Sequence, residues 1–543
     1  VENEINNDEN TSFDISVINI EENGSRLPIN YTLPNGVERE TLIGATSLQQ
    51  QNEQSLVLKV NDLENGDARG AFKNVSMDMR NYQKIKMFVH AEEINEGTLN
   101  DGDITVFLRL GSDYTTNYYE YEIPMKLTNW GESDADLIWP SENEFDIPFE
   151  LFQFVKQIRN NELNNPQNTS INSYNDLFEF FEDNHKISIL GNPNLGDVKA
   201  IMIGIRNPET VKDISDKSVE IWVNELRLTD FNEKGGWASR MQMKMGLADL
   251  GNIALAGSIS SVGFGSLEKN VSERNTEESQ RYNLSSSIEF GKFFPEKSNL
   301  KIPMYFSVSE DIKNPQYNPL DPDILLTTSL DVLETREERD SLKEITQDYT
   351  KRKSINFTNI RKERAPGNNK SKLYDIENLS LSYSYNESFY RNVNTEYSIN
   401  KQYNGGISYN FNTSPKNIKP FNKIKALRKG KYFRIIRDFN FYLMPKQISF
   451  RTDIFRSYLE TKLRNNTGLD FDIQPTYSKY FTLNRTSNIK YDLTRSLKLN
   501  FSSNTRSIID EPDGKIDEKE EVDSIMKNIL SLGRATEYHH NFD

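Results

Sequence analysis

Cysteine is absent from this chain of 543 residues, and its absence removes several kinds of chemistry at once. Disulfides, thiolate nucleophiles, iron–sulfur clusters and cysteine-ligated zinc sites are all excluded. Long apolar runs are missing too, because no segment approaches the roughly 18 to 20 apolar residues of a membrane helix. Membranes nevertheless stay open as an environment, since the strands of a β-barrel alternate and leave little hydropathy signal.

Basic residues are also in short supply. The chain has 65 lysines and arginines against 81 aspartates and glutamates, which gives a formal net charge of -16. Nucleic-acid binding needs clustered lysine and arginine side chains in a favourable field. We therefore expect no nucleic-acid partner.

The first part of the chain, residues 1–235, predicts a β-rich domain. Short apolar runs alternate there with turn residues such as Asn35 and Gly36, a pattern that favours a jelly-roll-like β-sandwich. We expect helices at Glu150–Arg159 and Tyr174–Asp183. The strands expected are Phe13–Ile20, Leu56–Val60, Lys84–Ala91, Ile104–Leu110, Tyr118–Ile123, Lys199–Arg206 and Val219–Leu228, the last of them central.

Long alternating strands dominate residues 236–510, after the pair Gly235-Gly236. One face of each strand is apolar, and the other is rich in serine, asparagine and threonine rather than in charges, as expected for strands that line a water-filled lumen. Closing such a series into a barrel removes its open edges. We therefore expect antiparallel barrel strands with Met243, Leu381 and Leu499 facing hydrocarbon. An opposing protein layer that seals these side chains would contradict this expectation.

Three stretches depart from the strand pattern. Charged loop insertions are expected at about 311–353 and 413–437, and helical charge spacing in Asp331–Lys353 predicts a short solvated helix. Residues 511–543 are expected to form an acidic loop that leads to further barrel strands. Aromatic residues near strand ends predict an interfacial girdle, made of Phe293, Phe294, Tyr390, Tyr432 and Phe433.

Two of these stretches carry charge patterns that bind ligands in other proteins. The basic run Lys416–Arg437 is a candidate binding segment for nucleic acid or anionic lipid, but we favour a solvated loop or barrel rim. The acidic run Asp510–Asp517 is faintly similar to a calcium-binding loop. Pro512 and the ligand spacing depart from the EF-hand pattern, so we favour an acidic turn.

Few residues suggest catalysis. Glu120 and Glu122 share a strand face, as a glycosidase pair would, but we expect a solvent-facing pair on a half-exposed strand. Phosphate loops, nucleophile elbows and His-Glu-x-x-His motifs are all missing from the sequence. We therefore expect no enzyme, no catalytic residue, no cofactor and no metal site.

The remaining candidates are histidines and tryptophans. His90 ends an apolar strand and is expected to be structural, while adjacent His539 and His540 point apart on a strand and make poor joint ligands. His185 stands alone. Three tryptophans of the first domain are candidates for stacking on sugars, although Trp222 lies next to an apolar strand face; they are Trp130, Trp139 and Trp222. A surface adhesin or carbohydrate-binding protein is therefore an alternative, and a substrate-specific porin or importer a weaker one.

Several stretches resemble the SprA family, also called Sov, of giant outer-membrane barrel proteins from Bacteroidetes. The resemblance is spread over about residues 30–540. The chain has neither an initiator methionine nor a signal peptide, and we interpret it as a fragment that lacks the family's remaining sequence on both sides. The stretches that carry the resemblance are Asp67–Arg80, Lys84–Glu92, Leu108–Tyr114, Val219–Gly265 and Arg434–Asp453.

The resemblance implies a function that the residues alone do not give. Members of this family form the translocon of the type IX secretion system, which passes folded cargo across the outer membrane and supports gliding motility. Partners implied in this way are secreted cargo proteins, a PorV-type shuttle barrel, a plug protein, a periplasmic peptidyl-prolyl isomerase and outer-membrane lipid. The strands of residues 236–510 would then be a sector of a very large outer-membrane β-barrel.

Overall fold

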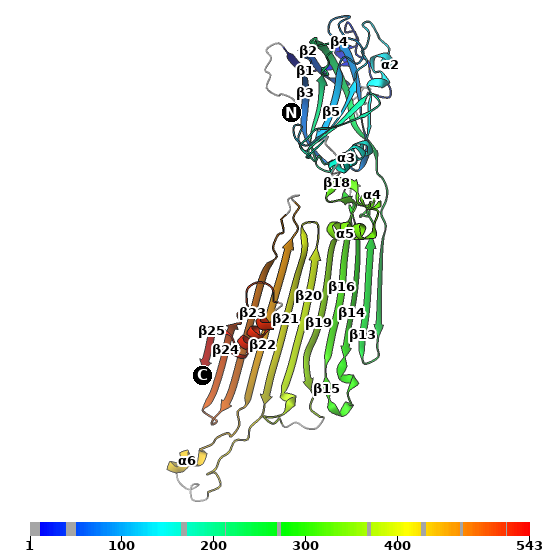
Figure 1. Cartoon of the computed structure of the whole chain (residues 1–543). Helices are drawn as coiled ribbons and strands as arrows, with labels where there is room; N and C mark the ends of the chain where they lie inside the picture. Colours follow the sequence, from blue (N-terminus) through cyan, green and yellow to red (C-terminus); the bar gives the residue numbers. More distant parts are fainter. Residues whose placement is uncertain are drawn as a thin grey trace. The chain divides into compact units, whose positions relative to one another are not determined.

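The computed structural model describes residues 11–39, 50–163, 171–211, 213–268, 273–365, 371–424, 431–466, 471–516 and 519–543. The chain divides into two compact units (Figure 1). Unit 1 consists of Val1–Lys234 together with Asp321–Thr328, and unit 2 of Gly235–Leu320 together with Ser329–Asp543. The sequence did not lead us to expect that residues 321–328 belong to unit 1.

Unit 1 contains two antiparallel sheets. The first has five strands, in the order β1 (Ser12–Asn19), β2 (Gln54–Leu63), β11 (Lys217–Phe231), β4 (Tyr82–Glu93) and β7 (Phe145–Pro148). The second has six, in the order β3 (Ala68–Met77), β10 (Val198–Arg206), β5 (Thr105–Gly111), β6 (Tyr118–Pro124), β9 (His185–Leu190) and β8 (Phe178–Glu182).

The core of unit 1 collects alternate residues from both sheets, as the period of two in a strand requires. Val219, Ile221 and Val223 of β11 are buried with Val106 and Leu108 of β5 in one hydrophobic cluster. Strand β11 lies between β2 and β4, so the prediction of a central strand here is confirmed. The predicted β-sandwich is confirmed as well.

One of the two helices predicted for unit 1 is present. Helix α3 (Phe149–Leu163) confirms the first prediction, and the shorter segments α1 (Ile20–Asn23), α2 (Ala135–Ile138) and η1 (Ser141–Asn143) join it. The helix predicted at Tyr174–Asp183 was wrong, because this stretch contains β8, which pairs with β9. Asp183, with a φ of 52°, begins a tight hairpin turn, and Phe178 and Phe180 reach the core at a strand's period rather than a helix's.

Unit 2 is built on one large antiparallel sheet, coloured from green to red in Figure 1. Within the described residues the sheet does not close on itself, which fits a sector of a larger barrel; the chain is 51% strand, so the all-β class is confirmed. The short strand β15 (Leu300–Lys301) pairs with β19. The path of the sheet is β12 (Ala238–Gly246), β13 (Gly251–Ser260), β14 (Glu277–Glu289), β16 (Pro303–Pro315), β19 (Asp348–Lys362), β20 (Leu379–Arg391), β21 (Thr395–Asn412), β22 (Gln447–Leu463), β23 (Thr476–Asp492), β24 (Lys498–Ile508) and β25 (Arg534–Phe542).

The connections of this sheet correct two expectations. Strand β16 continues to Pro315, and strand β19 already begins at Asp348. The insertion expected at 311–353 is therefore shorter than predicted. Helix α5 (Arg336–Thr346) occupies its charged part and begins at a capping box of Thr335 and Glu338. Residues 511–543, expected as a loop, include helix α7 (Lys519–Leu530) and strand β25.

The other short elements of unit 2 lie in connections between strands. None of the helices in the described parts of the chain is long and apolar enough to cross a membrane. The short elements are η3 (Phe290–Phe293), η4 (Glu296–Ser298), β17 (Tyr317–Asn318), β18 (Asp321–Leu325), α4 (Leu326–Asp331), η5 (Ile376–Asn378), η7 (Lys431–Phe433) and α6 (Arg434–Asp438), of which β18 and the start of α4 fall in unit 1.

Candidate functional site

The large sheet of unit 2 has two chemically different faces. Residues directly opposed in antiparallel strands share a face, so the strand registers sort the side chains. One row of what we call the polar face runs across seven strands as Ala254, Ser285, Ser307, Ser354, Asn386, Gln402 and Ser457. One row of the apolar face runs as Ile288, Met304, Phe357, Tyr383, Gly405, Ile454 and Leu483.

Neutral hydrogen bonds link neighbouring strands across the polar face. The Ser354 hydroxyl donates to Asn386 Oδ1 at 2.7 Å, and Asn404 Nδ2 donates to the Ser384 hydroxyl at 3.0 Å. The hydroxyls of Ser380 and Ser408 are 2.9 Å apart. Small hydroxyl and amide groups of this kind keep a surface wetted without fixing a strong field of either sign.

Within the described residues, no second layer seals the apolar face. Met243 is 51% exposed and Leu381 45%, and Leu499 is half-buried. These are the side chains for which burial under protein would have contradicted a lipid-facing wall. Among the described residues of unit 2, one small cluster packs on this face, around Phe481, Leu483, Ile509 and Ile525.

The apolar face changes character towards the end of the sheet where β12 begins, which we call the entry end. Along β20, the apolar residues Leu379 and Leu381 give way to Tyr383 and Tyr385 and then to Glu387. The Leu379–Tyr385 stretch spans about 20 Å at about 3.4 Å per residue, close to the roughly 25 Å apolar band of a membrane barrel.

Tyrosines and ion pairs mark the limit of this band nearest the entry end. The rings of Tyr385 and Tyr403 lie 4.9 Å apart on neighbouring strands. Closer to the entry end, Lys353 Nζ is 3.3 Å from Glu387 Oε1. Aromatic rings followed by charges are typical of a boundary between hydrocarbon and water. The residues predicted for the girdle do not form this boundary. Tyr390 lies on the polar face opposite Ser398, and Phe293 and Phe433 lie in connections between strands.

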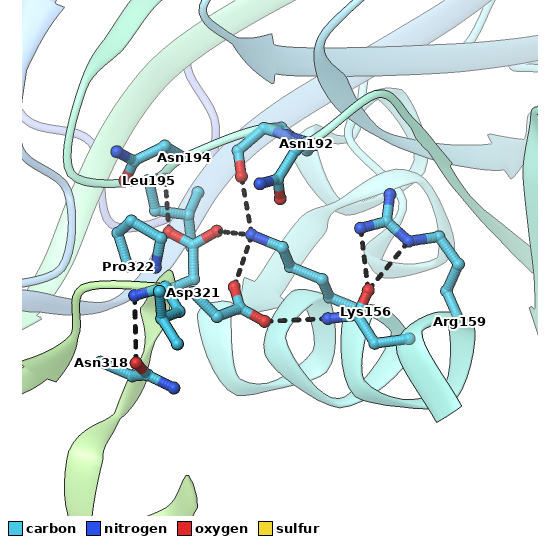
Figure 2. A network of polar contacts seen from close by, with 12 residues as sticks. Lys156, Arg159, Asn192, Asn194, Leu195, Asn318, Asp321 and Pro322 are labelled. Atoms are coloured by element: carbon cyan, nitrogen blue, oxygen red, sulfur yellow. Dashed lines mark hydrogen bonds and ion pairs between the residues drawn. The ribbon is translucent and has the colours of Figure 1, made fainter. Parts of the chain in front are cut away.

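A second feature is the anchoring of residues 321–328 in unit 1, shown in Figure 2. Lys156 of α3 is fully buried, and its Nζ lies 2.8 Å from Asp321 Oδ1 and 2.9 Å from Asp323 Oδ2. The same Nζ donates to the Pro193 carbonyl at 2.9 Å. Lys156 therefore neutralises the buried carboxylate of Asp323 and the partly buried carboxylate of Asp321 at once, and we call this cluster the lysine anchor.

Further donors complete the lysine anchor. Asp323 accepts hydrogen bonds from the Tyr119 hydroxyl and from the Leu195 amide, the second at 2.6 Å. Burial, followed by the negative charge of Asp323, raises the pKa of Tyr119 well above its ordinary value of 10.0. The phenol therefore stays protonated as a donor. Arg80 Nη1 donates to the Pro322 carbonyl at 3.0 Å, so main chain and side chains of the segment are both held.

The lysine anchor affects how the two units are joined. Ala238 opposes Ser260 and, two strands further, Pro315 opposes Glu277, so β12 begins and β16 ends at the entry end. The chain passes between the units after Lys234, after Leu320 and after Thr328. The two units are therefore joined by three covalent crossings rather than by one linker.

The carboxylates Glu120 and Glu122 are buried, so the expected solvent-facing pair was wrong. Glu120 forms an ion pair with Arg109 and lies 3.0 Å from Arg206 Nη1. Glu122 pairs with Arg206 and lies 2.9 Å from Lys186 Nζ. Cations from β5, β9 and β10 cover this face of β6, which the alternation of β6 by itself does not reveal. Carboxylates held by three cations are structural and are not open to a glycosidic bond.

Arg206 offers a test of this cluster. Replacing it in Arg206→Met removes one partner of both buried glutamates, and the free energy of unfolding of the full chain should fall by about 3 kcal/mol. The measurement is the urea midpoint at an unchanged slope. Lys126→Met, which breaks an exposed pair with Glu142, should leave the midpoint where it is. An equal midpoint in both variants would contradict a structural role for the cluster.

His90 and two of the three tryptophans considered in unit 1 are structural as well. His90 is buried, as expected, and its ring lies 3.9 Å from that of Trp222. Trp222 and Trp139 pack with Tyr31 in a second buried cluster and offer no surface to a sugar. Trp130 is partly exposed, at 37%. The carbohydrate-binding alternative therefore loses two of its three stacking candidates.

Elsewhere the ligand candidates are dispersed or already paired. His539 and His540 oppose Asn504 and Ser503 and so lie on different faces of β25, while His185 is 2.7 Å from the Tyr121 hydroxyl. In the described ranges, no group of three or more histidine, cysteine, aspartate or glutamate residues is placed to hold a metal ion.

Some of the charges in the two charged runs form ion pairs. Arg434 and Arg437 both pair with Asp438, while residues 425–430 of the basic run lie outside the described ranges. In the acidic run, Glu511 binds Arg456 through two contacts, at 2.5 and 2.9 Å. Asp517 lies outside the described residues.

Comparison with known proteins gives one match. Residues 1–330, more than half of the chain, match the SprA_N family model, which is described as a motility related/secretion protein. The matched range covers the β-sandwich, the segment held by the lysine anchor and the strands of unit 2 from β12 to β16. No curated protein matches the chain.

Proposed function

Because the chain belongs to the SprA_N family of motility-related secretion proteins, we propose that it forms part of a protein-conducting channel in the outer membrane. In this proposal the sheet of unit 2 is a sector of the wall of a very large barrel. The channel serves the type IX secretion system, passing folded cargo outwards and supporting gliding motility.

The observation that carries the proposal is the sorting of side chains in the large sheet. Rows of serine, asparagine and glutamine lie on one face, and rows of leucine, methionine and aromatic residues lie half-exposed on the other. A soluble sheet would bury its apolar face under another layer. A wall between lipid and a wet lumen needs both faces as they are.

The proposed mechanism is passive. The polar face is mostly neutral, and some of the charges that it carries are paired, as in Arg451 with Asp453 and Arg281 with Asp311. Such a face offers hydrogen bonds with little unpaired charge, so folded proteins of varied surface can pass without binding tightly. The chain contributes no catalysis in this proposal and is not an enzyme. Its partners are cargo proteins, a PorV-type shuttle barrel, a plug protein, a periplasmic peptidyl-prolyl isomerase and outer-membrane lipid, and it binds no nucleic acid.

Site-specific photo-crosslinking tests which face meets cargo. A photoreactive residue at Ser384, on the polar face, should give adducts with cargo in cells that are secreting. The same residue at Leu381, on the apolar face three positions away, should give adducts with lipid and none with cargo, because its side chain points away from the lumen.

The controls separate transport from proximity. Adducts at Ser384 should disappear when cargo synthesis is stopped and should accumulate when export is jammed. Cargo adducts from both positions, or from Leu381 alone, would contradict the assignment of the lumen. Normal secretion by cells that lack the full-length protein would contradict the channel itself.

A further inference from the structure

Helix α7 packs on the apolar face of the large sheet. Ile525 is buried in a cluster with Phe481 and Leu483 of β23 and with Ile509, and Ile529 packs against the same cluster. In Figure 1 the helix, coloured red, lies over strands β22 to β24. Because these strand residues belong to the apolar face, α7 lies on the side of the sheet that we assign to lipid.

The helix has an apolar flank that the sheet leaves uncovered. Val522, Met526 and Leu530 follow one another at intervals of four residues, which places them in one row along the helix. They are 48%, 51% and 80% exposed. The other exposed side chains of the helix are polar, with Lys519 and Asp523 bordering the apolar row and Glu520, Ser524 and Lys527 further from it. The helix therefore touches the sheet along its middle and separates an apolar side from a polar side.

The position of α7 coincides with the boundary marked by tyrosines. Tyr385, Tyr403, Arg456 and Phe481 oppose one another in a single row across four strands. Phe481 contacts α7, while Arg456 is held by Glu511 in the connection that leads to the helix. Lys479 Nζ donates to the Pro512 carbonyl in the same connection. The charged side chains of Arg456 and Lys479, which lie on the apolar face where the apolar band ends, are thus both bound by the connection that leads to α7.

We propose that α7 is an interfacial helix, lying where lipid acyl chains meet water. Val522, Met526 and Leu530 enter the acyl chains, and Glu520, Ser524 and Lys527 face headgroups and solvent. The occupant of the exposed row is lipid, because the row continues the apolar face of the wall at its boundary. This inference rests on the proposed membrane wall and adds a specific contact to it. Helices of this kind lie about 5–10 Å into the headgroup and acyl boundary.

No cysteine occurs in these 543 residues, so a thiol introduced here is unique within them; any cysteine elsewhere in the full-length protein is replaced by alanine before labelling. An environment-sensitive fluorophore is attached to Met526→Cys, Ser524→Cys or Ile407→Cys in the full-length protein, folded into phosphatidylcholine–phosphatidylglycerol vesicles. Ile407, 49% exposed on the apolar face, reports on the wall. Doxyl lipids with shallow or deep labels and aqueous iodide serve as quenchers.

Lipid contact predicts a distinct pattern at each position. Shallow doxyl lipid should quench the label at Met526 more than deep doxyl lipid, and iodide should quench the label at Ser524. The label at Ile407 should respond to doxyl lipid and not to iodide. If iodide alone quenches the label at Met526, or if neither quencher reaches it, as under a protein partner, the interfacial helix is overturned. Quenching of the label at Ile407 by doxyl lipid would still support the wall in that case. Loss of lipid quenching at Ile407 overturns the wall.

Discussion

Replacing Lys156 by methionine is expected to release residues 321–328 from unit 1. The side chain is fully buried, and Asp321 and Asp323 both depend on its charge. Removing one partner of a buried ion pair leaves uncompensated charge and costs about 3–5 kcal/mol. Methionine keeps much of the volume of lysine, so the loss should come from charge rather than from a cavity.

Thiol labelling measures this release locally. Ile324 is 7% exposed within the segment, and Ile324→Cys supplies the only thiol in the chain. When opening is fast compared with labelling, the labelling rate follows the population of the open state. The expected cost corresponds to labelling roughly 10²- to 10⁴-fold faster in the Lys156→Met background, at about 1.4 kcal/mol per tenfold change.

A surface lysine provides the matched control. Lys199 on β10 pairs with Asp197 at 2.9 Å but is 58% exposed, and exposed pairs contribute little. Lys199→Met should leave the labelling rate of the thiol introduced by Ile324→Cys unchanged. If Lys156→Met also left the rate unchanged, Lys156 would not hold the segment, and the three covalent crossings alone would join the units.

Most strands of unit 2 were predictable because they carry their own signal, whereas the start of β19 and the whole of β25 were expected as loops. In β20, Leu379, Leu381 and Tyr383 alternate with serines, and the alternation survives in the structure as two faces. The same local signal gave β11 of unit 1. Alternation reports which residues share a face but not what the face meets, so the environment that we propose for the apolar rows rests on the whole series of strands and on the family.

Features that depend on distant parts of the chain were not predictable in this way. Lys156 and Asp323 are 167 residues apart in sequence, and nothing near α3 indicates that a segment after β16 completes its surroundings. The stretch from Asn314 to Asp323 has three prolines and breaks the strand pattern, but a break alone does not say where the segment binds. Glu120 was misjudged for the same reason, because Arg206 comes from another strand.

Helix α7 shows a third kind of limit. Its apolar residues Val522, Ile525, Met526, Ile529 and Leu530 recur at helical spacing, so the signal was present in the sequence. The surrounding acidic residues made a loop look more plausible. The sequence does not show which of these apolar residues the sheet covers and which it leaves exposed, because that depends on contact with Phe481 and Leu483.

The largest effect of the membrane environment is expected for Leu381→Arg. Leu381 lies between Ile360 and Ile407 on the apolar face, four residues or about 14 Å along β20 from Tyr385. In a band roughly 25 Å tall, this position is near the bilayer midplane, where arginine costs about 2–4 kcal/mol. In water the same substitution at a 45% exposed site would stay within about 0.5 kcal/mol.

Ser382→Arg is the control at the same depth on the other face. Ser382 opposes Gly406, which itself opposes Asp453, so an arginine there gains an acidic neighbour and faces the proposed lumen; it loses only the hydrogen bond from the Asn359 amide, at 3.1 Å. The free energy of folding of the full-length protein into vesicles, measured by urea titration, should drop for Leu381→Arg by several times the change for Ser382→Arg. Equal changes would mean that both faces meet water, and unit 2 would then not be a membrane wall.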